Sequence, residues 1–301
     1  MASIDPQAEI REFLRSRRAR ITPQEAGLPA YGGNRRVSGL RREEVALLAG
    51  VSVDYYVRME RGSLAGASDS VLDALARALH LEDAERDHLF ALARAGGPKT
   101  SPNRKPASLS VRPAVRQILD AVTHAPAWVR NGRHDILAMN PLARALYAPV
   151  LLDPRRPANT TRFVYLQPDA ARELFVDYDQ VARDAAAMLR LEAGRNPHDK
   201  ALIELVGELS TQSEMFRKRW ASQDVRYHRS GRKRLRHPAV GQLDLDFEAL
   251  ELPSEPGLQL NIYTAAEGTP TCDALKLLAS WIASQDQVPS EQAPTGPARP
   301  A

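Results

Sequence analysis

The residues of this sequence with the clearest chemical pattern lie between positions 42 and 61. Two short stretches with apolar residues at helical spacing, 42–49 and 53–61, are joined by Gly-Val-Ser at 50–52. A helix, a tight turn containing glycine and a second helix form the unit that places one helix in the major groove of DNA. The chemistry to expect here is therefore the binding of phosphates and base edges.

This unit requires particular residue types at its inner positions. Ala46 is small enough for the two helices to cross closely, Gly50 provides the turn, and Val51 fills the space between the helices. Tyr56 and Met59 lie three residues apart, on one side of the second helix, and are expected to point inward. The opposite face of the second helix is then left free to meet DNA.

The run from Gly39 to Gly62 resembles the Cro/repressor-type (XRE) helix-turn-helix family. Its Leu-Ala-Gly-Val-Ser segment and its final Glu-Arg-Gly carry the resemblance. The similarity covers about residues 10–95 and implies an all-α domain of five helices. The sequence departs from the family at Arg41, where relatives often have a Ser or Thr cap, so capping is expected from Ser38 or from water.

The resemblance places phosphate contacts at the start of each motif helix. Arg42 is expected to bind a phosphate together with backbone N–H groups. Ser52 is expected to do the same at the second helix, which it also caps. Arg61 is expected to contact the DNA backbone. Arg35 and Arg36, in the preceding loop, are expected to reach phosphates or the minor groove. The alternative is that this loop is only solvated.

Base contacts are expected from the exposed face of the second helix. Val53 can touch a thymine methyl group, and Tyr55 can reach a base edge or a phosphate. Asp54 either accepts a hydrogen bond from cytosine N4 or only interacts with the helix dipole. Arg58 is the best candidate for reading guanine, with a phosphate contact as the alternative.

The second half of the chain changes to a mixture of strands and helices. Apolar runs on both sides of Asn131-Gly132-Arg133 predict a hairpin. Alternating apolar residues predict antiparallel strands at 241–250 and 257–263, each with one buried face. The predicted helices cover 142–147, the region up to about 193, 199–209, 213–223 and 271–283. This half is therefore expected to be an α+β domain.

This half resembles the MmyB-like ligand-binding domain. The matching pieces are 135–140, 217–220, 233–238 and 263–265. The resemblance implies a PAS-like sheet with helices over one face and a pocket for a small apolar effector such as a fatty acid. No bound cofactor is expected. The candidate pocket residues are Trp128, Asn140, Tyr165, Trp220 and Tyr263, with core packing as the alternative for the four aromatic residues. Asn140 is also expected to tie a strand to a helix by a hydrogen bond.

The stretch 217–236 is strongly basic, with Asp224 as its only acidic residue. It is interpreted as the mouth of a pocket for an anionic head group, as a second surface facing DNA, or as a solvated strand face. His228 and His237 lie in or beside this stretch without acidic or cysteine partners, which is weak evidence for a metal site.

The 301 residues are 43% hydrophobic and 26% charged, as in ordinary globular proteins, and are enough for two domains. The net charge of +4 does not by itself indicate nucleic-acid binding. No apolar run approaches the roughly 20 residues that span a bilayer, and no secretory signal is visible, so a cytoplasmic protein is expected. Cys272 is the single cysteine and cannot form an internal disulfide.

Composition divides the chain into four segments. A helix-turn-helix domain at 1–95 and a ligand-binding domain at 108–283 are separated by a Gly- and Pro-containing linker at 96–107. The end, 284–301, is rich in Pro, Gln, Ser and Ala and is expected to be disordered.

The predicted function is a sequence-specific transcription regulator controlled by a small effector. A homodimer on a pseudo-palindromic operator in double-stranded DNA is expected, because such domains read two half-sites about one helical turn apart. No GxSxG, HExxH, P-loop or GxGxxG motif is present, so no catalytic site is expected. The alternatives are a protein-interaction or antitoxin-like module without effector sensing, and an enzyme whose PAS-like half binds flavin or haem.

Overall fold

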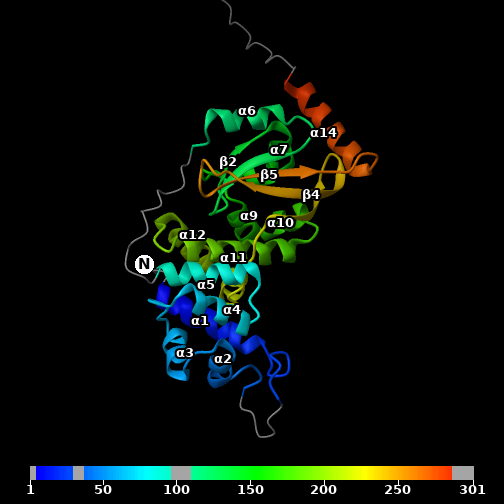
Figure 1. Ribbon diagram of the computed structural model, residues 1–301. Coiled ribbons are helices and arrows are strands. Elements are labelled where there is room, and N and C mark those ends of the chain that lie inside the picture. Colours follow the sequence, from blue (N-terminus) through cyan, green and yellow to red (C-terminus); the bar gives the residue numbers. More distant parts are fainter. Residues whose placement is uncertain (1–4, 30–36, 96–109, 287–301) are drawn as a thin grey trace, which may run out of the picture.

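The protein has a helical N-terminal part and a C-terminal part that combines a sheet with helices (Figure 1). The computed structural model describes residues 5–29, 37–95 and 110–286. The predicted linker 96–107 lies outside the described residues, as does most of the predicted tail.

The helices of the N-terminal part pack around one apolar core. Their bounds are α1 (Pro6–Arg20), α2 (Arg42–Ala49), α3 (Val53–Glu60), α4 (Asp69–Ala78) and α5 (Asp83–Ala95). Side-chain oxygens of Asp5, Ser52 and Ser68 accept hydrogen bonds from first-turn N–H groups of α1, α3 and α4. These caps confirm the helix starts that the sequence predicted. Phe13 and Leu75, which are fully buried, belong to the core.

Two glycines with positive φ shape the region around α3. Gly50 ends α2 with φ 66°, and Gly62 follows α3 with φ 107°. A Cβ atom at Gly62 would lie 2.6 Å from the carbonyl oxygen of Gln7. Glycine at this position therefore permits both the left-handed backbone and the close approach of α1 to the end of α3.

The C-terminal part is built on a five-stranded antiparallel sheet with the strand order β2-β1-β5-β4-β3. Its strands are β1 (Ala127–Asn131), β2 (Ile136–Met139), β3 (Ser230–His237), β4 (Gly241–Glu251) and β5 (Leu258–Thr264). The predicted hairpin and the two predicted later strands are confirmed. On β4, Leu243 and Leu245 are fully buried while Asp244 and Asp246 are exposed, as the alternating pattern indicated.

Helices cover both faces of this sheet (Figure 1). They are α6 (Pro113–Ala121), α7 (Pro141–Leu146), α8 (Ala148–Leu151), α9 (Thr160–Leu166), α10 (Pro168–Leu174), α11 (Tyr178–Arg195), α12 (Lys200–Gln212), α13 (Glu214–Ala221) and α14 (Pro270–Asp286). On one face, α6 packs Val115 and Leu119 against β1 and β5. On the other, a larger core joins the sheet to α7, α9–α12 and α14.

Three features differ from the sequence expectations. The basic stretch contains the edge strand β3, which the sequence offered only as one interpretation. Leu235 and His237 alternate with exposed arginines and are buried. The helix α6 was not predicted. The last helix, α14, continues to Asp286, so the first three residues of the predicted tail are helical.

Candidate nucleic-acid interface and ligand cavity

The geometry between α2 and α3 fits the packing of a helix-turn-helix. Ala46 is 1% exposed at the crossing, and its carbonyl oxygen accepts a hydrogen bond of 3.0 Å from the N–H of Val51 in the turn. The hydroxyl of Ser52 accepts a hydrogen bond from the N–H of Tyr55 at 3.2 Å. Tyr56 and Met59 are completely buried, which confirms the predicted inner face of α3.

The opposite face of α3 is open to solvent. Val53 is 44% exposed, and Asp54 and Arg58 are exposed as well. Tyr55 is half-buried, and the guanidinium carbon of Arg58 lies 4.8 Å from the centre of its ring. This contact orients the Arg58 side chain along the exposed face. Arg61, just after the helix, is also exposed.

A buried carboxylate at the end of α3 holds two arginines. The side chain of Glu60 is 2% exposed, and its Oε1 accepts a hydrogen bond of 2.6 Å from Nε of Arg18. Its other oxygen accepts a hydrogen bond from Nε of Arg42, whose side chain remains 51% exposed. This hydrogen bond raises the pKa of Arg42. Arg42 is thus anchored by Glu60 while its remaining N–H groups can face a phosphate.

An arginine-lined hollow of about 440 Å³ lies at the start of α2. The basic residues lining it are Arg15, Arg18, Arg41 and Arg42. The N–H of Arg41 donates to the carboxylate of Glu44 at 2.6 Å, and the Arg41 side chain makes no cap hydrogen bond. Sequence reasoning expected a cap from Ser38 or water and did not single out Arg15 or Arg18 for DNA binding. Arg35 and Arg36 lie outside the described residues.

A cavity of about 40 Å³ lies in the C-terminal part between the sheet and the helices α9 and α11. Pockets for drug-sized ligands usually have volumes of about 300–1,000 Å³. The cavity would therefore have to open before it could hold a ligand of that size. Its lining includes apolar residues such as Val164 and Met188 and also buried polar residues, namely Arg130, His134 and Asn261.

The predicted pocket residues occupy different places relative to this cavity. Trp128 lines it. Tyr263 lies directly behind the lining, because its hydroxyl is 2.6 Å from that of Tyr147, which does line the cavity. The Tyr165 hydroxyl donates to the Ala182 carbonyl oxygen in the surrounding core. For Tyr165 the structure thus shows the core packing that the sequence offered as the alternative.

Asn140 has the structural role that the sequence suggested. Its Oδ1 accepts hydrogen bonds from the N–H of Ala127 at 3.0 Å and of Ala143 at 2.8 Å. Its Nδ2 donates to the carbonyl oxygens of Val122 and Ala125, both at 2.7 Å. The side chain therefore ties the start of β1 to the start of α7 and does not line the described cavity.

Trp220 belongs to the junction between the two parts of the protein. Its ring stacks on Phe216, and the guanidinium carbon of Arg190 lies 4.0 Å from the centre of the Trp220 ring. Arg190 is 1% exposed and forms an ion pair with Glu9 of α1. The tryptophan thus packs against a side chain that links α11 to the N-terminal helices, away from the described cavity.

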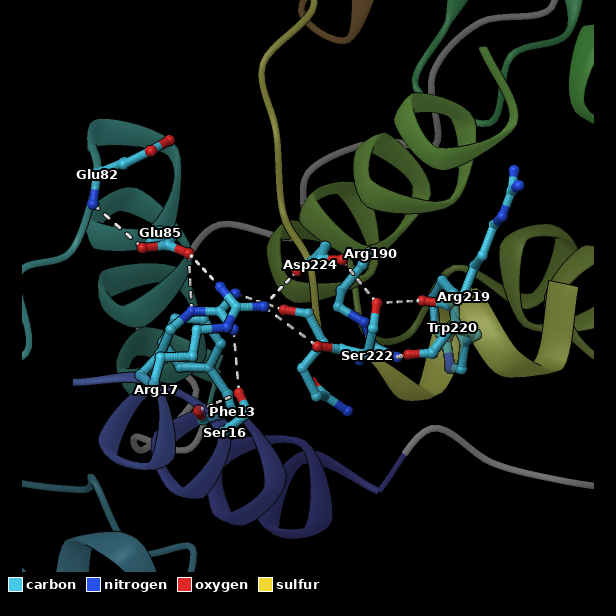
Figure 2. A network of polar contacts seen from close by, with 12 residues as sticks. Phe13, Ser16, Arg17, Glu82, Glu85, Arg190, Arg219, Trp220, Ser222 and Asp224 are labelled. Atoms are coloured by element: carbon cyan, nitrogen blue, oxygen red, sulfur yellow. Dashed lines mark hydrogen bonds and ion pairs between the residues drawn. The ribbon is translucent and has the colours of Figure 1, made fainter. Parts of the chain in front are cut away.

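A second buried arginine strengthens this junction from the N-terminal side. Arg17 of α1 is 2% exposed, forms an ion pair of 2.8 Å with Glu85, and donates to the carbonyl oxygen of Gln223 (Figure 2). Burial lowers the pKa of Arg17 to about 10, although Glu85 opposes this shift. The side chains of Leu191 and Val225 enter the N-terminal core. The two parts are therefore packed together through α11 and the segment after α13.

Within the described residues, no three or more His, Cys, Asp or Glu side chains gather where they could hold a metal ion. None of the described helices combines the length and apolar character needed to cross a bilayer.

Comparison with known families agrees with both halves of this geometry. Residues 9–89 match the family described as helix-turn-helix domain, and residues 111–278 match the MmyB-like transcription regulator ligand binding domain. No significant match to a curated protein is found. Both matched families are regulator-type domains, and the second covers more than half of the chain. The chain therefore belongs to the MmyB-like transcription regulators, with an XRE-type helix-turn-helix preceding the ligand-binding domain.

Proposed function

We propose that this regulator recognises a specific operator sequence by placing α3 in the major groove of double-stranded DNA. The observation that carries the proposal is the division of α3 into two faces. Tyr56 and Met59 are buried against the core, whereas Val53, Asp54 and Arg58 are exposed. A helix anchored in this way can enter a groove without losing its packing.

The contacts divide into phosphate binding and base reading. Arg42, Ser52 and Arg61 bind phosphates, and Arg35 and Arg36 reach phosphates or the minor groove. The base-reading set is Val53, Asp54, Tyr55 and Arg58. The exposed hollow lined by Arg15 and Arg41 extends the phosphate-binding surface. A homodimer would place two copies of α3 on the half-sites of a pseudo-palindrome.

The C-terminal domain is proposed to bind a small apolar effector, with fatty acids as the leading class, at the cavity beside α11. Apolar side chains of α9 and α11 support this assignment, because Val164, Val181 and Met188 line the cavity. The strand order β2-β1-β5-β4-β3, with β5 in the centre between β1 and β4, supports a PAS-like sheet. The proposal includes the domain bounds 1–95 and 108–283, a cytoplasmic location and a non-enzymatic role.

The helix α11 offers a physical connection between effector and DNA. Its residues Asp184, Ala185 and Met188 line the cavity, and within the turn that follows Met188 the residues Arg190 and Leu191 contact the N-terminal part. An effector that enlarges the cavity would displace α11 and with it the junction. It acts as a switch only if its affinity differs between the DNA-binding and non-binding arrangements.

A footprinting experiment tests the proposed function. The full chain is added to labelled intergenic DNA taken from beside its own gene, with shuffled DNA of the same composition as the control. We expect a sharply bounded protected region at concentrations that leave the shuffled DNA unprotected. Equal protection of both DNAs at every concentration would show that α3 does not read sequence.

A further inference from the structure

Gly194 of α11 lies directly against His88 of α5, where the two parts of the protein meet. A Cβ atom at position 194 would lie 2.4 Å from Nδ1 of the His88 ring, which is closer than side-chain atoms can approach. The ring has little room to move aside, because it is completely buried and lies edge to face with Phe13 at a centroid distance of 5.0 Å. Position 194 therefore has to be glycine for α5 and α11 to pack in this arrangement.

The links across this junction are largely polar. Besides the contacts of Arg17 and Arg190, the hydroxyl of Tyr227 donates a hydrogen bond to the carboxylate of Asp87 in α5. Among the described residues, the buried or partly buried members of the N-terminal core that come from the C-terminal part are Leu191, Val225 and Tyr227. Each part would therefore keep nearly all of its own apolar core if the two separated. Polar contacts between domains of one chain commonly permit such relative motion.

Several buried polar atoms at the junction have no hydrogen-bond partner among the described residues. They are both ring nitrogens of His88, Nε of Arg190 and Oε1 of Gln223. Burial, reinforced by the charges of Arg190 and Arg17, lowers the pKa of His88 to about 3, so the ring is neutral at physiological pH. Burying unpaired polar atoms costs free energy, and water would remove this cost if the junction opened. The docked arrangement is therefore suited to open reversibly.

We propose that this junction is a latch that opens and closes, with the contact between Gly194 and His88 at its centre. In the closed form the N-terminal part is held in one orientation on α11. The latch does not act by covering the recognition surface, because Val53, Asp54 and Arg58 of α3 are exposed in the closed form. It acts by fixing the direction in which α3 points. The inference rests on the proposed recognition of an operator by α3.

A fixed direction of α3 matters most when two copies of the protein bind one operator. On a pseudo-palindrome, closed latches present both copies of α3 at a set spacing, so the second half-site is bound at a high effective concentration. Open latches leave the helix-turn-helix intact but lose this advantage. Met188, which lines the cavity, is on the same helix as Gly194. A ligand that shifts α11 would therefore act directly on the latch.

A wedge at position 194 tests the latch in the full chain. Donor and acceptor dyes are attached through Arg77→Cys in α4 and Ala201→Cys in α12, two exposed positions in different parts, in a Cys272→Ser background. Gly194→Val should lower the energy transfer clearly below the wild-type value, because its side chain does not fit against the His88 ring and forces the junction open. Wild-type energy transfer in Gly194→Val would overturn the proposal.

A matched control and a rescue variant separate this effect from general damage to a helix. Gly207 lies in α12, and no atom outside its own stretch of helix would lie within 4 Å of a Cβ placed there, so Gly207→Val should keep wild-type energy transfer. Adding His88→Ala to Gly194→Val removes the ring that the valine meets and should restore most of the energy transfer. An equal loss in Gly207→Val, or no recovery in the double variant, would contradict the assignment of this contact.

Operator binding by the same variants reports the function of the latch. The DNAs are the operator found by footprinting and a duplex that contains one of its half-sites. We expect Gly194→Val to bind the full operator at least about tenfold more weakly and the single half-site with wild-type affinity. Unchanged affinity for the full operator despite lost energy transfer, or an equal loss on the half-site, would contradict this role. Because energy transfer is measured without DNA, failure of the latch is distinguishable from failure of operator recognition.

Discussion

Replacing Glu60 with glutamine is expected to lower the free energy of unfolding by about 3 kcal/mol, towards the low end of the range for breaking a buried ion pair. The Glu60 side chain is 2% exposed and holds both Arg18 and Arg42. Without the carboxylate, the Arg18 guanidinium, which is 14% exposed, remains as a largely buried charge. Arg42 can turn towards water, so the expected loss of free energy of unfolding stays below the largest values found for broken buried ion pairs. Urea denaturation followed by circular dichroism measures the change.

The matched control is Glu43→Gln on the neighbouring helix. Glu43 is 63% exposed and lies 3.6 Å from Arg41, so its substitution should cost less than about 1 kcal/mol. Equal stability of Glu60→Gln and the wild type would show that the buried carboxylate does not hold the N-terminal helices together.

Operator affinity is expected to fall about 10³-fold when the salt concentration rises from 50 to 200 mM. Each phosphate neutralised by an arginine releases condensed counterions, so six contacts give a slope of roughly −5 in a plot of log affinity against log salt. The exposed arginines around α2 and α3 provide the charge for this effect. Fluorescence anisotropy with a labelled operator at five salt concentrations gives the slope.

A shallow slope would contradict the proposed phosphate-binding surface. A value between 0 and about −2 corresponds to at most two phosphate contacts. The control is Arg116→Ala in the C-terminal part, remote from α3, which should leave the slope unchanged.

The local features of the N-terminal part were predictable because they depend on short sequence spacings. A cap such as Asp5 before Pro6, or Ser52 before α3, acts within one helical turn and needs no distant partner. The same holds for the inward positions Tyr56 and Met59, whose three-residue spacing places them on one side of α3. The exposed face of α3 is then the side opposite these two inward residues.

The features that depend on distant parts of the chain were not predictable in this way. Glu60 has its role only because Arg18, 42 residues earlier, folds against it. Lys233 lines the cavity although most side chains of β3 are exposed. The sequence indicates its inward position only through its two-residue spacing from Leu235, which places both residues on the same face of the strand. Trp220 was expected in a pocket but packs on Arg190 at the junction, because the docking of the two parts is not encoded in local spacing.

The central claim is that the exposed face of α3 reads base pairs, and a competition footprint with Arg58→Ala tests it most directly. Wild type, Arg58→Ala and Arg42→Ala are compared on the operator and on operators with single base-pair changes. We expect Arg58→Ala to lose about 1–3 kcal/mol of discrimination at one base pair of each half-site, and Arg42→Ala to weaken binding to every sequence about equally. Full wild-type preference in the Arg58→Ala footprint would contradict it.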